Sequence, residues 1–187
     1  MSTNYPDYKS KLHSQIQEEY GKIVYTYTCH FKIADRLQKR NARMKWCQLI
    51  LSAISTGGFL GTVITNQQFL IWISGLCSTI LLVLNGYLKD KDIASEISAH
   101  MKAGNELWKI REDYLSLLTD FDVLSDSDIA EKRDAMIERC AIAYATMPAT
   151  DSDSYQKAQQ ALKNDEEQFF SQEELNKMLP QHLRKED

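Results

Sequence analysis

No charged residue and no histidine occurs between Trp46 and Leu88, although Asp, Glu, Lys and Arg make up 26% of the chain. A helix needs roughly 20 apolar residues to cross the hydrocarbon core of a bilayer, and this stretch is long enough for two such helices. The alternative is a buried hairpin of a large soluble protein. We disfavour that interpretation because the two flanking segments are too small to cover such a hairpin.

Catalytic motifs are also missing. The sequence contains no Gly-rich phosphate loop, no nucleophile elbow and no HExxH zinc motif. Adjacent carboxylates such as Glu18–Glu19 and Glu112–Asp113 point in different directions on a helix, so they do not make an acid–base pair. We therefore expect a protein that is not an enzyme and that needs no cofactor.

The cysteines show no spacing that indicates a shared site. Cys29, Cys47, Cys77 and Cys140 are far apart, and no CxxC or Cys/His pattern occurs. Neither a disulfide framework nor a metal site is predicted. The first apolar stretch begins far from the N-terminus, so no secretory signal is predicted either.

The polar cluster TNQQ at residues 65–68 divides the apolar stretch into predicted membrane helices at about 46–64 and 69–88. The turn carries no cation, and Lys89 and Lys91 after the second helix alternate with Asp90 and Asp92. The segment before the first helix is rich in cations, namely Lys32, Arg36, Lys39, Arg40, Arg43 and Lys45. The positive-inside rule then predicts a multi-pass membrane protein with both termini in the cytoplasm.

The first membrane helix carries many glycines and hydroxyls, which lower its intrinsic tendency to insert. Ala53, Gly57 and Gly61 recur at every fourth position, a spacing that lets two helix backbones approach closely. Such a stripe serves packing within the hairpin, packing between subunits, or the lining of a pore, and these uses remain open. The candidate residues for helix packing or pore lining are Ala53, Ser55, Thr56, Gly57, Gly58, Gly61, Thr62, Ser78 and Asn85.

The second membrane helix repeats small residues at the same spacing, in the pairs Ser74 and Ser78, and Gly75 and Thr79. No charged side chain is expected at membrane depth in either helix. This argues against a proton pump or an ion-coupled transporter, which normally carry one.

Both flanking arms show an apolar heptad pattern that is typical of a coiled coil. The first lies within the cytoplasmic segment 1–45 and comprises Ile16, Tyr20, Ile23, Tyr27, His30, Ala34 and Leu37. The second lies within the predicted helix 89–122 and comprises Ile93, Ile97, His100, Gly104, Leu107, Ile110, Tyr114, Leu117 and Phe121. We expect both arms to continue the membrane helices as long rods that pack antiparallel.

The rise of a helix predicts the register of that pair. If Trp46 and Leu88 lie level, His30 faces Gly104 and Ala34 faces His100, which places a large residue opposite a small one twice. The two histidines are expected to pack in this interface; a pH-responsive or metal site is the weaker alternative. The candidate residues of the cytoplasmic seam are Tyr27, His30, Ala34, His100, Gly104 and Leu107.

Residues 123–187 are predicted to form a small helical appendage, which completes an all-α fold. Ser125 or Ser127 caps a helix that runs to about Thr146, and a second helix covers 152–163. Ser171 and Glu174 form a capping box for a short helix that ends near Leu179. The C-terminal tail QHLRKED is expected to be loose.

This arrangement resembles the SLATT family of bacterial two-transmembrane effector domains, which associate with nucleotide synthases and sensors of the SMODS and SLOG types. The resemblance covers nearly the whole chain and rests on the order and spacing of several stretches. They are YTCHFKIADRLQKRNARMK, LSAISTGG, NGYLKDKD, NELWKIREDYLSLLTDF and YQKAQQALKNDEEQFFSQEELNKMLPQHLRK.

The resemblance implies an effector of an antiviral conflict system, which oligomerises in the inner membrane on a nucleotide or other infection signal and permeabilises it. The family offers no established catalytic residues. The chain has no recognisable sensor domain, so the signal would come from a partner protein. The other expected partners are the lipid bilayer and further copies of the chain. We expect no specific nucleic-acid binding, because the basic segment 32–45 lies beside the membrane and suits anionic lipid.

Two other functions fit the same pattern. One is a non-conducting membrane anchor whose cytoplasmic helices recruit a partner. The other is a constitutive small channel, which is disfavoured because no stretch resembles a selectivity filter.

Overall fold

The computed structural model describes residues 7–65, 67–89 and 91–184. Every regular element in these ranges is helical, so the predicted all-α fold is confirmed. Asn66 of the predicted turn, Asp90 of the charged segment after it and the last three residues of the predicted loose tail lie outside the described residues.

Helix α1 (Tyr8–Thr65) is a single helix of 58 residues. At 1.5 Å per residue it is about 87 Å long, which is far more than a bilayer requires. The predicted boundary at residues 45 and 46 lies inside this continuous helix and coincides with no change of element. Gly57 and Gly58 also lie within the unbroken helix.

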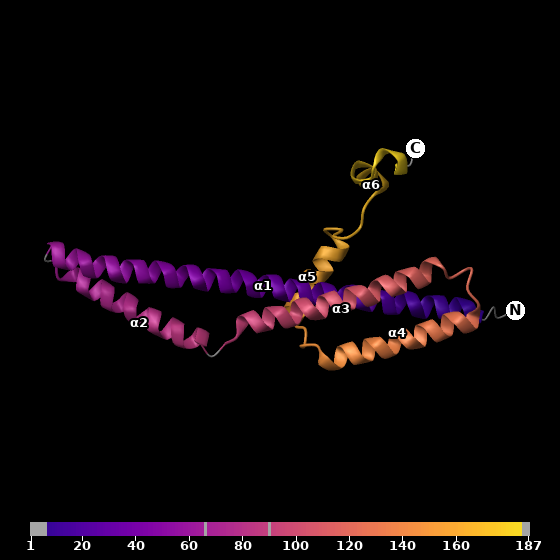
Figure 1. The fold of residues 1–187 in the computed structure, drawn as a ribbon, viewed down its shortest axis with the longest axis horizontal. Helices are drawn as coiled ribbons and strands as arrows, with labels where there is room; N and C mark the ends of the chain where they lie inside the picture. The colour runs from indigo at the N-terminus through magenta and orange to yellow at the C-terminus, as the bar shows by residue number, and fades with distance from the viewer. Residues whose placement is uncertain (1–6, 66, 90, 185–187) are drawn as a thin grey trace.

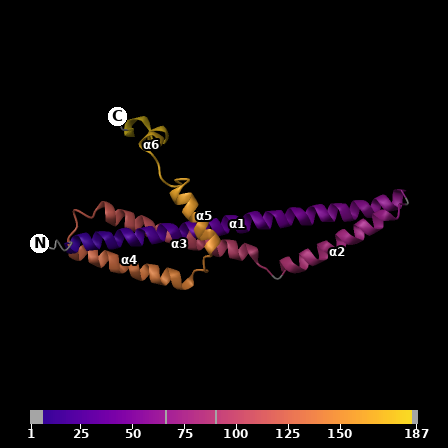
Figure 2. The ribbon, with the colours of Figure 1, turned by 180° about the vertical axis from the view of Figure 1, so that it is seen from behind.

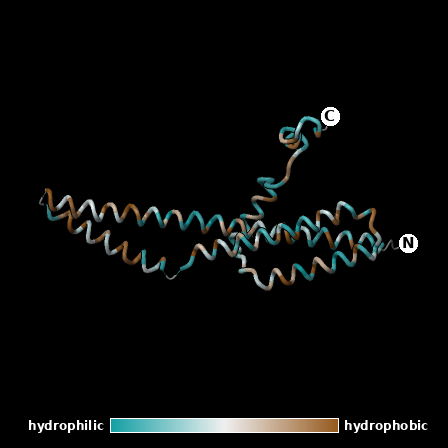
Figure 3. The backbone as a smooth tube through the Cα atoms, viewed as in Figure 1, coloured by the Kyte–Doolittle hydropathy of each residue, from teal (hydrophilic) through white to brown (hydrophobic). Residues whose placement is uncertain are grey.

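Helix α2 (Phe69–Lys89) returns along the apolar end of α1 and forms a hairpin with it (Figures 1 and 3). The turn closes where the Leu70 and Ile71 amides donate to the carbonyl oxygens of Gln67 and Gln68, at 3.2 and 3.1 Å. Thr65 and Lys89 end these helices one residue beyond the predicted spans 46–64 and 69–88, and the start predicted at residue 46 lies inside α1.

Helix α3 (Ile93–Thr119) does not continue α2, which corrects the prediction of an unbroken second rod. The chain leaves the helix after Lys89 and starts a new one at Ile93 (Figure 1). The Asp92 side chain accepts a hydrogen bond of 3.0 Å from the Ser95 amide and so caps the new helix. Asp92, as an N-cap residue, was therefore a signal in the sequence for the break between α2 and α3.

The predicted seams form the core between α1 and α3. Tyr27, Leu107 and Tyr114 are fully buried in its main cluster, and a second cluster of Ile33, Leu37 and Ile93 lies next to the hairpin. Tyr20 and Ile97 are only partly buried. The heptad positions thus identified the buried faces of both arms.

The register of this pair differs from the predicted one by about one helical turn. His30 contacts His100 instead of Gly104, and the ring of Phe31 covers Gly104. The break between α2 and α3 accounts for the direction of the shift. Residues outside a helix advance the chain by up to about 3.3 Å each, so α3 lies further from the hairpin than a continuous helix would.

The appendage contains α4 (Asp126–Thr146), α5 (Ser152–Lys163), α6 (Gln172–Met178) and a 3₁₀ turn, η1 (Gln181–Leu183). Ser125 caps α4, and Ser171 with Glu174 forms the predicted capping box of α6. Helix α4 packs on α3 and α5 crosses α1, whereas α6 projects away from the other helices in both views (Figures 1 and 2). The 3₁₀ turn gives part of the tail a regular structure that was not predicted.

Candidate functional site: the apolar hairpin and its junction with the helical bundle

The hairpin exposes its apolar side chains instead of burying them. Within the described residues, the most apolar window of α1 is 0% buried and that of α2 is 6% buried. Trp72 and Ile64 are 80% and 82% exposed. A core helix of a soluble protein buries most of such a window, so this band of exposed apolar surface indicates a lipid environment.

The two hairpin helices touch along a narrow face of small residues. A Cβ atom on Gly58 would lie 2.4 Å from the Ser74 hydroxyl oxygen, and one on Gly61 would lie 3.2 Å from Leu70 Cδ1. Ser74 is the buried residue of α2. The missing side chain of Gly58 therefore lets the helices approach at this point.

Polar side chains join the helices on either side of that contact. The hydroxyl oxygens of Ser55 and Ser78 lie 2.6 Å apart, and the Gln48 amide donates to Asn85 Oδ1 at 2.7 Å. Thr62 donates instead to the carbonyl oxygen of Gly58 within its own helix. These bonds satisfy polar groups that would otherwise face lipid unpaired.

The structure divides the predicted packing or lining residues into two sets. Ser55, Gly58, Gly61, Ser78 and Asn85 lie against the partner helix. The prediction did not separate these from the exposed residues Ala53, Thr56 and Gly57, because both sets share small side chains.

The second set leaves open surface on the hairpin. No described atom lies within 4 Å of a Cβ built on Gly57 or on Gly75. A groove of about 510 Å³ runs beside the contact and is lined by Ser55, Thr56, Phe59, Ile71, Ser74, Gly75 and Ser78. The sequence analysis missed Gln48 and Leu70 as contact residues. The available signal for the contact face of α1 was the spacing of three residues from Ser55 to Gly58 and from Gly58 to Gly61.

The seam between α1 and α3 contains a buried histidine pair. The Nδ1 atoms of His30 and His100 lie 2.9 Å apart, and both rings are at most 3% exposed. Burial and the neighbouring His100 lower the pKa of His30 to about 4, and burial also lowers the pKa of His100. Among the described residues, no cluster of His, Cys, Asp and Glu is arranged to hold a metal ion.

Helix α5 is held against α1 by ionic contacts that the sequence did not reveal. Arg36 pairs with Asp151 and Asp153, and Lys32 lies 2.8 Å from a carboxylate oxygen of Glu167. Hydrogen bonding from Arg36, with the cap to Ser154, lowers the pKa of Asp151 to about 2. The acidic appendage thus neutralises part of the basic arm.

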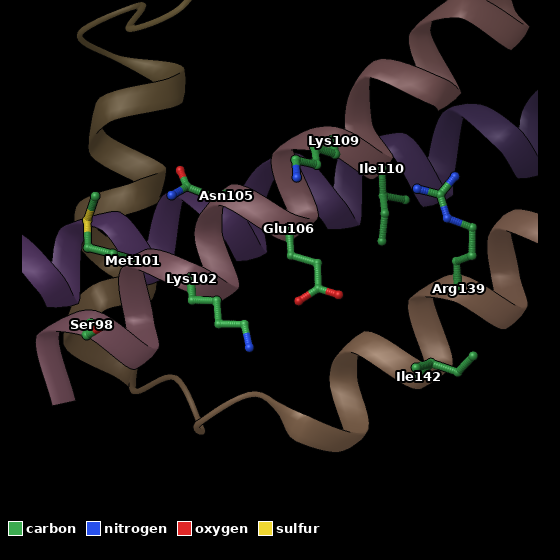
Figure 4. Close-up of a pocket in the computed structure, with 9 residues that line it drawn as sticks. All are labelled: Ser98, Met101, Lys102, Asn105, Glu106, Lys109, Ile110, Arg139 and Ile142. Atoms are coloured by element: carbon green, nitrogen blue, oxygen red, sulfur yellow. The ribbon is translucent and has the colours of Figure 1, made fainter. Parts of the chain in front are cut away.

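A separate cleft of about 640 Å³ lies between α3 and α4 (Figure 4). Lys102 and Glu106 from α3 and Arg139 from α4 project toward it. Arg139 pairs with Asp113, whereas Lys102 and Glu106 form no ion pair within the part of the chain that the structure describes. The cleft presents charges of both signs on an open surface.

The family model described as SMODS and SLOG-associating 2TM effector domain family 4 matches residues 12–174. The chain belongs to this family. The match spans the hairpin, the α1–α3 seam and most of the appendage, so it confirms the predicted resemblance to SLATT proteins. No curated protein and no solved structure matches this SLATT chain.

Membership makes the chain a two-transmembrane effector domain of a conflict system, and its two exposed apolar helices agree with a location in a membrane. The family description also links it to partner systems of the SMODS and SLOG types.

Proposed function

We propose that this SLATT protein assembles in the inner membrane into a homo-oligomeric pore that permeabilises the cell when a signal reaches its cytoplasmic helices. The open small-residue surface of the hairpin is the observation that carries the proposal. Two helices cannot enclose water, so a pore needs several hairpins. Ala53 and Gly57 face outward from the hairpin contact and leave room for a neighbouring helix.

The groove beside the contact supplies a candidate pore lining. Thr56, Gly75 and Ser78 place hydroxyls and bare backbone along it, where a water column needs polar groups. Gly57 and Gly58, with their low helix propensity, are candidate points for bending of α1 between closed and open states.

The proposed topology places both termini in the cytoplasm. Arg40, Arg43 and Lys45 precede the membrane part of α1, and Lys89 ends α2, while no described residue of the turn is charged. The α1–α3 pair, proposed as an antiparallel coiled coil, would then lie in the cytoplasm. There it could receive a signal from a nucleotide-sensing or signal-generating partner.

Exchange of the hairpin tests this function. Residues 46–88 are replaced by an unrelated two-helix anchor of equal length, and membrane permeability is followed by dye entry in cells that express either chain. The pore hypothesis predicts that the wild-type chain admits dye once activated and that the exchanged chain does not. Equal permeabilisation by both chains would refute it.

A non-conducting anchor that recruits a partner is the second candidate. The α3–α4 cleft favours it, because Lys102 and Glu106 there are available to a partner protein. If the exchanged chain keeps its full protective effect in infected cells without any dye entry, the hairpin acts as an anchor and the cleft becomes the site to study.

A further inference from the structure

The cations between residue 22 of α1 and the start of α3 fall into two groups according to their partners. Lys22, Lys32, Arg36 and Lys39 each pair with a carboxylate. Closer to the hairpin the pattern changes, and the cations form no ion pair with any described residue. They are Arg40, Arg43, Lys45, Lys89 and Lys91.

Two of these unpaired cations gather around one aromatic ring. The Arg40 guanidinium lies 5.9 Å from the centre of the Tyr87 ring and also donates to its hydroxyl. The Lys91 ammonium lies 5.2 Å from the centre of the same ring. Tyr87 therefore holds a cation from α1 and a cation from the α2–α3 linker near each other at the end of the hairpin.

Among the described residues, the nearby carboxylates Asp35 and Asp92 do not neutralise this pair of cations. Asp35 binds Lys39 at 2.7 Å, and Asp92 accepts the hydrogen bond that caps α3. Arg40 is half-buried, so its charge is less screened than that of a fully exposed side chain. An arginine fork with an adjacent lysine suits a phosphate group, which accepts several hydrogen bonds at once.

We propose that Arg40, Tyr87 and Lys91 bind the phosphate of an anionic phospholipid in the cytoplasmic leaflet. The headgroup layer lies at this level if the apolar hairpin spans the bilayer, and Trp46 is exposed beside it as an interfacial aromatic residue would be. The site requires the membrane location of the hairpin but not a pore.

Occupancy of this site would connect the hairpin to the cytoplasmic bundle. Lys91 belongs to the short segment that separates α2 from α3, and Arg40 belongs to the continuous α1. A phosphate bound by both would fix the bend between α2 and α3 against α1. The lipid would thereby hold the point at which motion of α3 could pass into the membrane.

The test compares the association of spin-labelled phosphatidylglycerol and phosphatidylcholine with the full-length protein in vesicles. The wild-type chain should prefer phosphatidylglycerol, and Arg40→Gln with Lys91→Gln should reduce the preference by roughly fivefold or more. Lys45→Gln with Lys89→Gln is the matched control, because it removes the same charge from the same surface but leaves the Tyr87 cluster intact. It should keep most of the preference.

Three results would overturn the proposal. One is the absence of any preference for phosphatidylglycerol in the wild-type chain. Another is an equal loss in both double variants, which would show a diffuse surface potential instead of a site. The third is displacement of the labelled lipid by inorganic phosphate at constant ionic strength, which would identify a soluble phosphate as the ligand. Helicity and amide exchange in α1 show whether the variants are folded.

Discussion

The Nδ1 atoms of His30 and His100 lie 2.9 Å apart in the buried interface between α1 and α3. Two ring nitrogens at this distance share one hydrogen, so one imidazole donates and the other accepts. If both rings were cationic, neither could accept, and two like charges would face each other out of water. The contact therefore joins the helices only while at least one ring is neutral.

This pair predicts that acid weakens the contact between α1 and α3. The pKa of His30 is lowered from 6.5 to about 4, so the unfolded chain takes up a proton at a higher pH than the folded chain does. The stability contributed by the neutral pair is complete above about pH 6.5 and falls as the pH drops toward 4, by about 3 kcal/mol at most from His30. Amide exchange in α3, measured between these values, tests this.

Variants at the histidines test whether this pair causes the pH dependence, and the charged groups near His100 also affect its protonation. Glu96 and Asp151 favour the cationic form of His100, and Arg36 opposes it. His30→Gln with His100→Gln should remove most of the pH dependence, whereas His182→Gln, at an exposed position, should leave it intact. An unchanged pH profile in the double variant would show that other groups cause the effect.

A side chain at Gly104 should destabilise the α1–α3 contact. A Cβ there would lie 2.6 to 2.9 Å from three ring carbons of Phe31, which itself packs against Tyr27. We expect Gly104→Ala to lower the free energy of unfolding by about 1–2 kcal/mol despite its better helix propensity. Gly21→Ala, with no described atom within 4 Å of the new Cβ, should instead raise it by up to about 1 kcal/mol. Denaturant unfolding of both variants checks the prediction, and equal stabilities would contradict it.

Removal of the Asp151 carboxylate should loosen α5 from α1. This side chain accepts the capping bond from the Ser154 amide at 2.7 Å and pairs with Arg36, so Asp151→Ala should lose about 1 kcal/mol of helix stability. Because the pKa of Asp151 is lowered to about 2, the contact should persist at pH 4 and above and weaken only as the pH falls toward that value. Proteolysis near Pro148 reports the release. In the control variant Asp153→Ala the Asp151 cap of α5 remains, so cleavage near Pro148 should be much slower than in Asp151→Ala.

Gly58 should be required for close packing of the hairpin. Gly58→Ala places a methyl group 2.4 Å from the Ser74 hydroxyl oxygen, and Ser74→Ala in the same chain should restore much of the loss. Gly75→Ala is the control, since its Cβ would meet no described atom within 4 Å. Distances between spin labels on α1 and α2 measure the packing. A Gly58→Ala hairpin as tight as the Gly75→Ala one would show that the glycine is dispensable.

Local signals in the sequence were sufficient for most of the helices. The charge-free stretch identified the hairpin, and Ser125 and Ser171 marked the starts of α4 and α6 because caps act through bonds to nearby amides. The heptads identified the buried faces of α1 and α3. The capping role of Asp92 was missed because KDKD is also an acceptable helical sequence.

The arrangement of the site required tertiary contacts. Gly57 and Gly58 are equivalent by composition, and only the direction of α2 decides that Gly58 meets Ser74 while Gly57 faces outward. The pairing of His30 with His100 depended on the break after Lys89. The ion pairs of Arg36 link segments more than a hundred residues apart, which no local pattern indicates.

The assembly of a pore through the outward face of the hairpin is tested most directly by dye release from vesicles that contain the purified protein. Gly57→Leu changes this face while leaving the hairpin contact in place, so the proposal predicts that release by the activated wild-type protein is lost in this variant. Gly57→Ala, which keeps the residue small, should retain it. Undiminished release by a folded Gly57→Leu protein would contradict the proposed interface, and vesicles that stay tight with every variant and with the wild-type chain under activating conditions would contradict the pore.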